Sequence, residues 1–64
     1  MHRAFLLTER EREVAGMLKA GLGPQEIAGK LGLRPATVYQ YIWIIKEKYE
    51  VKSLVGLVVK LCRE

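Results

Sequence analysis

Residues 24–38, PQEIAGKLGLRPATV, decide the fold of this chain. The apolar side chains between residues 27 and 31 recur at helical spacing, which predicts a short helix. Gly32 ends that helix, because glycine tolerates the left-handed backbone conformation found at helix ends. Pro35 suits the first position of a new helix, so the turn spans only about residues 32–34. A short helix, a tight turn and a longer helix are the outline of a helix-turn-helix.

The longer helix covers residues 35–49 and has two distinct sides. At 100° per residue, one narrow arc is apolar and is expected to face the core. That arc holds Val38, Ile42, Ile45 and Tyr49, with Tyr41 at its edge. The opposite stripe, expected to face outward, holds Ala36, Gln40, Trp43 and Glu47. Tyr39 and Lys46 flank this stripe on one side, and Thr37 and Ile44 on the other.

Helical patterns also occupy the two ends of the chain. Thr8-Glu9-Arg10-Glu11 is a capping box that begins a first helix, and Gly21 ends it. The charged side chains of residues 9–13 are expected to be solvated. Ser53 is an acceptable cap for a last helix. We therefore predict an all-α fold and a single domain over residues 1–64, with helices at about 8–20, 24–31, 35–49 and 53–62.

The last predicted helix is apolar over more than half of its circumference. Leu57 and Leu61 lie on the side expected to face the core, with Leu54 and Val58. Val55, Val59 and Cys62 widen the apolar arc beyond what so small a domain can cover. An uncovered apolar stripe is usually a contact surface, so these three residues are the predicted interface of a homodimer. Cys62 could form an intersubunit disulfide there, but we expect a buried, reduced side chain.

The composition and charge of the chain favour some classes of function and argue against others. Residues 34–64 carry six basic and three acidic side chains, which favours a polyanionic partner. One cysteine and one histidine cannot make an intrachain disulfide or a closed zinc site, and His2 is given no role. No nucleophile–base pair or phosphate-binding loop is recognisable, so we expect no enzyme, metal or cofactor. The longest apolar runs, residues 41–45 and 54–59, fall short of the ~18 needed to span a bilayer, so a cytoplasmic location is expected.

Several short motifs are spaced along the chain without gaps over residues 7–58. They are Leu7-Thr8-x-Arg10-Glu11-x-Glu13-Val14, Gly21-Leu22, Glu26-Ile27-Ala28-x-x-Leu31, Pro35-x-Thr37-Val38, and Ile45-x-x-Lys48 with Val51. In combination they resemble the LuxR/GerE family of DNA-binding domains. The resemblance implies a four-helix domain whose third helix enters the DNA major groove and which dimerises through its fourth helix. It leaves open whether the chain is a stand-alone protein or a piece of a longer one, although Met1 favours the former.

The chain departs from the family pattern at several positions. Arg34 stands where the family usually has serine, Tyr39 where it has lysine, and Tyr41 where it has histidine. Tyr49 stands where the family usually has leucine, Glu50 where it has glycine, and Leu54 where it has arginine. Positions 43 and 44, usually polar or basic, are Trp43 and Ile44. The outward stripe is therefore more aromatic and less basic than the family pattern.

Seven residues are the predicted DNA-binding site. Gln40 could pair with adenine, and Trp43 could contact a thymine methyl group or the sugar–phosphate wall. Phosphate contacts are expected from Arg34, Thr37, Tyr39, Lys46 and Lys48. Several of these residues also have an interpretation that involves no DNA. Gln40 and the lysines could simply be solvated, and Thr37 could bond its own backbone. Lys48 could pair with a glutamate of the first helix, and Trp43 could be a core residue or cover a protein interface.

The resulting prediction is a homodimeric, sequence-specific transcription regulator, with helix 35–49 in the major groove and half-sites about one helical turn apart. Two alternatives stay open. Trp43 and Ile44 could instead make the helix-turn-helix a protein-interaction module, since apolar groups suit a protein groove. The turn and residues 8–14 also resemble sigma-factor region four, although the apolar last helix argues against that version.

Overall fold

Four helices make up most of the computed structural model, which describes residues 6–63. They are α1 (Glu9–Lys19), α2 (Pro24–Leu31), α3 (Pro35–Tyr49) and α4 (Leu54–Cys62), and residues 6–63 contain no strand. The prediction of an all-α, four-helix fold is confirmed. The observed bounds differ from the expected ones only at the cap residues Thr8, Ala20 and Ser53. His2 lies outside the described residues.

The predicted starts of α1 and α4 are confirmed by their hydrogen bonds. The Thr8 hydroxyl accepts from the Glu11 amide at 3.2 Å, and the Glu11 carboxylate accepts from the Thr8 amide at 3.0 Å. At α4, the Ser53 hydroxyl accepts from the Gly56 amide at 2.9 Å. Each bond satisfies an amide that has no partner inside the helix, so these two starts are fixed by their own sequence.

The ends of α1, α2 and α3 share one local structure. At each end the backbone turns to positive φ, at Gly21, Gly32 and Glu50. The next residue is an apolar side chain whose amide donates to the carbonyl five residues back: Leu22 to Met17 at 3.0 Å, Leu33 to Ala28 at 2.9 Å and Val51 to Lys46 at 3.0 Å. This is the bond that defines a Schellman motif, and all three apolar residues pack against the core. The pattern of glycine followed by an apolar residue therefore predicts the ends of α1 and α2. It does not predict the end of α3, where glutamate takes the place of glycine.

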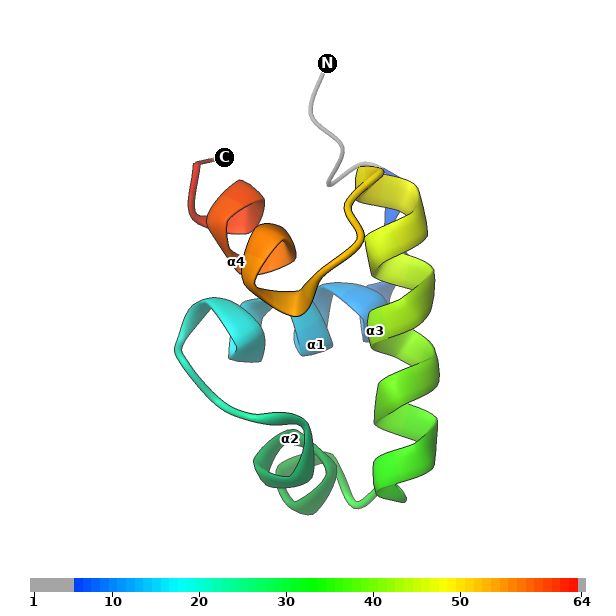
Figure 1. Cartoon of the computed structure of the whole chain (residues 1–64). Coiled ribbons are helices and arrows are strands. Elements are labelled where there is room, and N and C mark those ends of the chain that lie inside the picture. The colour runs from blue at the N-terminus through cyan, green and yellow to red at the C-terminus, as the bar shows by residue number, and fades with distance from the viewer. Residues whose placement is uncertain (1–5, 64) are drawn as a thin grey trace.

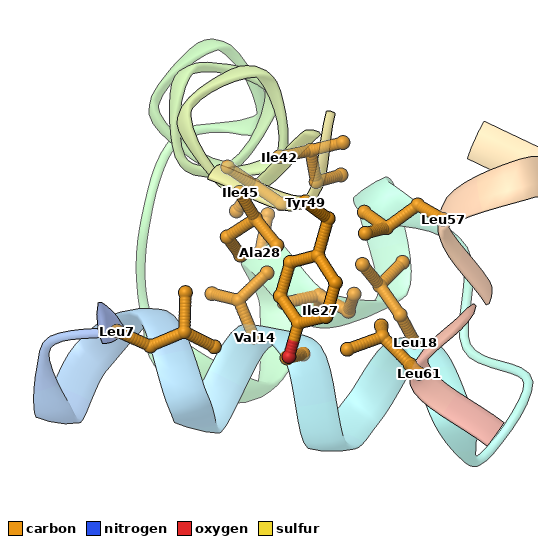
Figure 2. Close-up of a cluster of buried hydrophobic side chains, with 12 residues drawn as sticks. Leu7, Val14, Leu18, Ile27, Ala28, Ile42, Ile45, Tyr49, Leu57 and Leu61 are labelled. Carbon is orange, nitrogen blue, oxygen red and sulfur yellow. The ribbon is translucent and has the colours of Figure 1, made fainter. Parts of the chain in front are cut away.

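The third helix stands along one edge of the molecule, with the other three helices on the same side of it (Figure 1). Its predicted core arc is confirmed, because Val38, Ile42, Ile45 and Tyr49 are all buried. Figure 2 shows the Tyr49 ring reaching from α3 towards α1, among apolar side chains contributed by all four helices. Burying a large apolar side chain contributes about 1.5–3 kcal/mol, so this arc fixes the rotation of α3 about its axis.

The connection between α2 and α3 is as short as predicted. Only residues 32–34 separate the two helices. Gly32 has φ 68° and ψ 32°, and Arg34 has the extended conformation that a following proline favours. So short a turn leaves α2 no freedom to move far from the beginning of α3. The observed connection is that of a helix-turn-helix.

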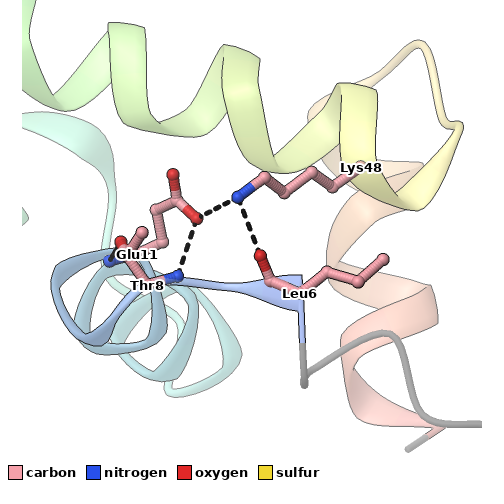
Figure 3. Close-up of polar contacts among 4 residues, drawn as sticks. All are labelled: Leu6, Thr8, Glu11 and Lys48. Atoms are coloured by element: carbon pink, nitrogen blue, oxygen red, sulfur yellow. Dashed lines mark hydrogen bonds and ion pairs between the residues drawn. The ribbon is translucent and has the colours of Figure 1, made fainter.

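An ion pair between α1 and α3 fixes the far end of α3. The Lys48 ammonium donates to the Glu11 carboxylate at 2.7 Å and to the Leu6 carbonyl at 2.8 Å (Figure 3). Glu11 is 5% exposed, so its expected solvation is wrong: the carboxylate caps α1 and meets Lys48 at once. Burial raises the pKa of Glu11, but the bonds from Lys48 and Thr8 outweigh it and hold that pKa below its ordinary value. The pair predicted as an alternative for Lys48 is confirmed.

The positive φ of Glu50 generates a first prediction. A residue with a Cβ pays about 1 kcal/mol or more in the left-handed region, and glycine does not. Glu50→Gly and Glu50→Ala both remove the carboxylate, so their difference isolates the backbone cost. We expect the glycine variant to be more stable by about 1 kcal/mol, measured by urea unfolding. As a matched control, Gly32→Ala should lose a similar amount; equal stability of the two Glu50 variants would contradict the assignment.

The ion pair generates a second prediction. Lys48→Met leaves the Glu11 carboxylate buried without its cation, and we expect a loss of roughly 2 kcal/mol in the free energy of unfolding at pH 7. Because the pKa of Glu11 is lowered by folding, its contribution is complete above the unfolded pKa of about 4.3 and is lost as the pH falls through the folded pKa.

The measurement is urea unfolding followed by far-ultraviolet circular dichroism at pH 7 and at about pH 3. The difference between wild type and Lys48→Met should be smaller at the lower pH, because protonation of the Glu11 carboxylate removes the ion pair. Lys46→Met, two residues earlier on the same helix, is the control and should change stability little. If the stability difference between wild type and Lys48→Met does not change with pH, Lys48 stabilises the fold without the Glu11 carboxylate.

Candidate nucleic-acid interface

The outward stripe of α3 lies in solvent along its whole length. Ala36, Gln40, Trp43 and Glu47 are all exposed, as the helical pattern predicts. Trp43 is 60% exposed and Tyr39 is 54% exposed, which makes them two of the most exposed large apolar side chains in the described part of the chain. The interpretation of Trp43 as a core residue is therefore wrong. This side of α3 presents two aromatic rings and an amide to any partner.

The other predicted phosphate-contacting residues lie around this stripe. Arg34 is exposed at the N-cap of α3, where its side chain makes no capping hydrogen bond. Thr37 and Lys46 are half-buried on opposite flanks of the helix. Arg34 lies beside the first amides of α3, whose partial positive charge favours an anion. The beginning of α3 thus combines a cationic side chain with the positive end of the helix dipole.

Lys48 is placed differently from the other predicted site residues. Its ammonium is held between Glu11 and Leu6 on the side of α3 that meets α1. A phosphate contact from Lys48 would compete with this ion pair. The Glu11 carboxylate that closes the capping box is the group that Lys48 bonds.

A depression lies beside the stripe that the sequence did not predict. It has a volume of about 190 Å³ and is lined by Thr37, Gln40, Tyr41 and Ile44. These residues recur at i, i+3, i+4 and i+7, so they form one continuous strip of the helix surface. That spacing is the signal that could have found it. Gln40 belongs both to the outward stripe and to the wall of this depression.

The exposed arc of α4 matches the prediction only in part. Val55 is 74% exposed and Val59 is 44% exposed, while Leu57 and Leu61 are buried. The expectation of a buried Cys62 is wrong, because the thiol is exposed at the end of α4, beyond the side that faces the core. Lys60 donates to the Tyr49 carbonyl at 3.0 Å and ties α4 to the end of α3.

The described residues give no support for two other kinds of site. Among residues 6–63, no three histidine, cysteine, aspartate or glutamate side chains gather so that they could hold a metal ion. None of the helices in that range combines the length and apolar character needed to traverse a bilayer.

The sequence of this chain is similar to one known protein family and to individual members of it. Residues 6–61 match the family described as "Bacterial regulatory proteins, luxR family". The chain is 39% identical over 54 residues to the transcriptional regulatory protein DesR of Bacillus subtilis, covering 84% of the chain and 27% of that protein. It is 45% identical over 51 residues to the transcriptional regulatory protein UhpA of Escherichia coli, covering 80% of the chain and 26% of that protein.

The chain spans about a quarter of the length of these relatives. No solved structure gave a significant match. The family match nevertheless covers α1 to α3 and nearly all of α4, including the short turn before α3. The chain therefore belongs to the luxR family of bacterial regulatory proteins, a family of DNA-binding transcription regulators.

Proposed function

We propose that this chain is the sequence-specific DNA-binding unit of a transcription regulator, that it acts as a homodimer in the cytoplasm, and that each copy places α3 in the major groove. The observation that carries the proposal is the exposure of one entire side of α3, opposite an arc that is wholly buried. The major groove is about 12 Å wide and admits one helix, provided that the rest of the domain stays behind it. The edge position of α3 meets this condition (Figure 1).

Phosphate contacts would orient α3 in the groove. Arg34, Thr37, Tyr39 and Lys46 border the outward stripe and carry donors that suit phosphate oxygens. Gln40 and Trp43, on the stripe itself, would face the bases. Lys48 would add a phosphate contact only by leaving Glu11, so in our proposal its main role is to hold α3 in place.

Dimerisation would occur through the exposed arc of α4. Val55, Val59 and Cys62 form an apolar surface that residues 6–63 leave uncovered. Burying it against the same surface of a second copy removes apolar area from water and gives a symmetric interface. Two copies related by a twofold axis would contact half-sites roughly 34 Å apart on DNA.

The first test of this proposal uses salt. Each phosphate neutralised by the protein contributes roughly −0.9 to the slope of log K against log salt concentration. A duplex selected from a random pool should bind with a steep negative slope, measured by fluorescence anisotropy. Arg34→Ala and Lys46→Met should each make the slope shallower by about 0.9, without a change in folding. Failure to select any duplex, or binding that ignores salt, would contradict the proposal.

The second test uses oligomeric state. Val55→Lys together with Val59→Lys places two charges in the proposed interface, and the exposure of both residues makes a large folding defect unexpected. Sedimentation should then show a dimer for wild type and a monomer for the double variant. Gln25→Lys, an exposed position on α2, is the control for added charge and should stay dimeric. A double variant that remains a dimer would exclude α4 as the interface.

A second candidate function rests on the exposure of Trp43 beside Ile44. Aromatic side chains are enriched where proteins bind other proteins, and an exposed tryptophan suits such a contact. The helix-turn-helix would then be a protein-interaction module. Trp43→Ala separates the two functions: loss of a protein complex with unchanged DNA affinity favours this candidate, and loss of DNA affinity favours the first.

A further inference from the structure

The outward stripe of α3 carries no arginine or lysine. Its four members are two apolar side chains, one amide and one carboxylate: Ala36, Trp43, Gln40 and Glu47. Arginine and lysine are the side chains that most often recognise guanine, through its O6 and N7 atoms. The cations on or beside α3 lie elsewhere, with Arg34 at the N-cap, Lys46 on a flank and Lys48 held by Glu11. The surface that would face the bases is therefore poorly equipped to contact guanine.

Gln40 lies between two surfaces that are mainly apolar. On one side, one helical turn further along α3, is the indole of Trp43, which is 60% exposed. On the other side is the depression of about 190 Å³, whose remaining walls come from Thr37, Tyr41 and Ile44. Glu47 lies near the C-terminal end of the stripe, whereas base contacts come from the N-terminal part of a recognition helix. The central part of the outward stripe thus consists of the Gln40 amide with mainly apolar groups on both sides.

This arrangement matches the major-groove edge of A·T base pairs. Adenine presents N7 as an acceptor and N6 as a donor, and a glutamine amide bonds both at once. Thymine presents a C5-methyl group, which an apolar side chain covers. A G·C pair presents no methyl group, and its guanine offers two acceptors, so it fits neither the apolar surfaces nor both ends of the amide.

We propose that α3 recognises consecutive A·T base pairs, with Gln40 on an adenine and with Trp43 and the depression on the methyl groups of neighbouring thymines. The proposal rests on the proposed function, since it needs α3 in the major groove. Burying one methyl group contributes about 0.8 kcal/mol, which is roughly a fourfold change in affinity. Specificity at these positions comes from methyl groups rather than from charge.

The test replaces single thymines by uracil in a duplex selected from a random pool. Uracil pairs with adenine in the same way and lacks only the C5-methyl group. We expect the affinity of the wild-type protein to fall roughly fourfold at two or more positions in each half-site and to stay unchanged elsewhere. Circular dichroism of each protein variant checks that it is folded.

Protein variants assign the methyl contacts to residues. Trp43→Ala should bind thymine and uracil equally at one of the sensitive positions and keep the wild-type response at the others. Ile44→Ser should lose discrimination at a different position, next to the depression. Gln40→Ala, the matched control on the same stripe, should keep both methyl responses and relax the preference for adenine.

The outcomes separate this proposal from the one that it rests on. A selected duplex with a G·C-rich half-site, or binding that ignores every uracil, overturns methyl recognition and leaves DNA binding intact. A Trp43→Ala protein with the affinity and methyl response of wild type overturns the role of Trp43. Failure to select any duplex overturns both proposals, and a protein partner lost with Trp43→Ala would then identify the surface as a protein-binding site.

Discussion

The burial of one side of α3 determines where the rest of the molecule lies. Val38, Ile42 and Ile45 recur at helical spacing and are buried together, with Tyr49 filling the space between α3 and α1. A rotation of α3 by one residue, about 100°, would carry this arc into solvent and bring polar side chains into the core. The energetic cost of that rotation is several buried apolar side chains. The exposure of Gln40 and Trp43 is thus a direct consequence of the core.

Restraints at both ends of α3 supplement this apolar anchor. At its beginning, the short turn of residues 32–34 restrains the helix relative to α2. At its end, Lys48 bonds to Glu11 and Leu6, and Lys60 bonds to the Tyr49 carbonyl. These three bonds occupy two lysines, Lys48 and Lys60, of which Lys48 was predicted to contact phosphate. In this chain, part of the positive charge serves to position α3.

Local sequence rules predict much of the fold because they act over a few residues. The capping box at Thr8, the glycines before Leu22 and Leu33, and the 3.6-residue period of α3 each have a local physical cause, and each is confirmed. The left-handed conformation of Glu50 does not follow from the backbone preference of glutamate, which disfavours that region; the hint in the sequence is that the resembling family usually has glycine at this position.

Features that depend on contacts between distant segments were predicted less well. Glu11 looked solvated because its partner Lys48 lies 37 residues away, and a period within one helix does not show such a pairing. Cys62 was expected to be buried because the width of the apolar arc on α4 does not show where its packing stops. The depression beside Gln40 depends on side-chain shape, which spacing gives only in outline.

Trp43 is the only tryptophan in the chain, so its fluorescence reports directly on whether the outward side of α3 is open or covered. If α3 enters the major groove, its outward side is open in the free protein and covered when DNA binds. Acrylamide quenching of tryptophan fluorescence should therefore be efficient in the free protein and strongly reduced by a saturating amount of the selected duplex. An indole that is shielded in the free protein, or one that is quenched equally with and without bound duplex, would contradict the proposed placement of α3 in the groove.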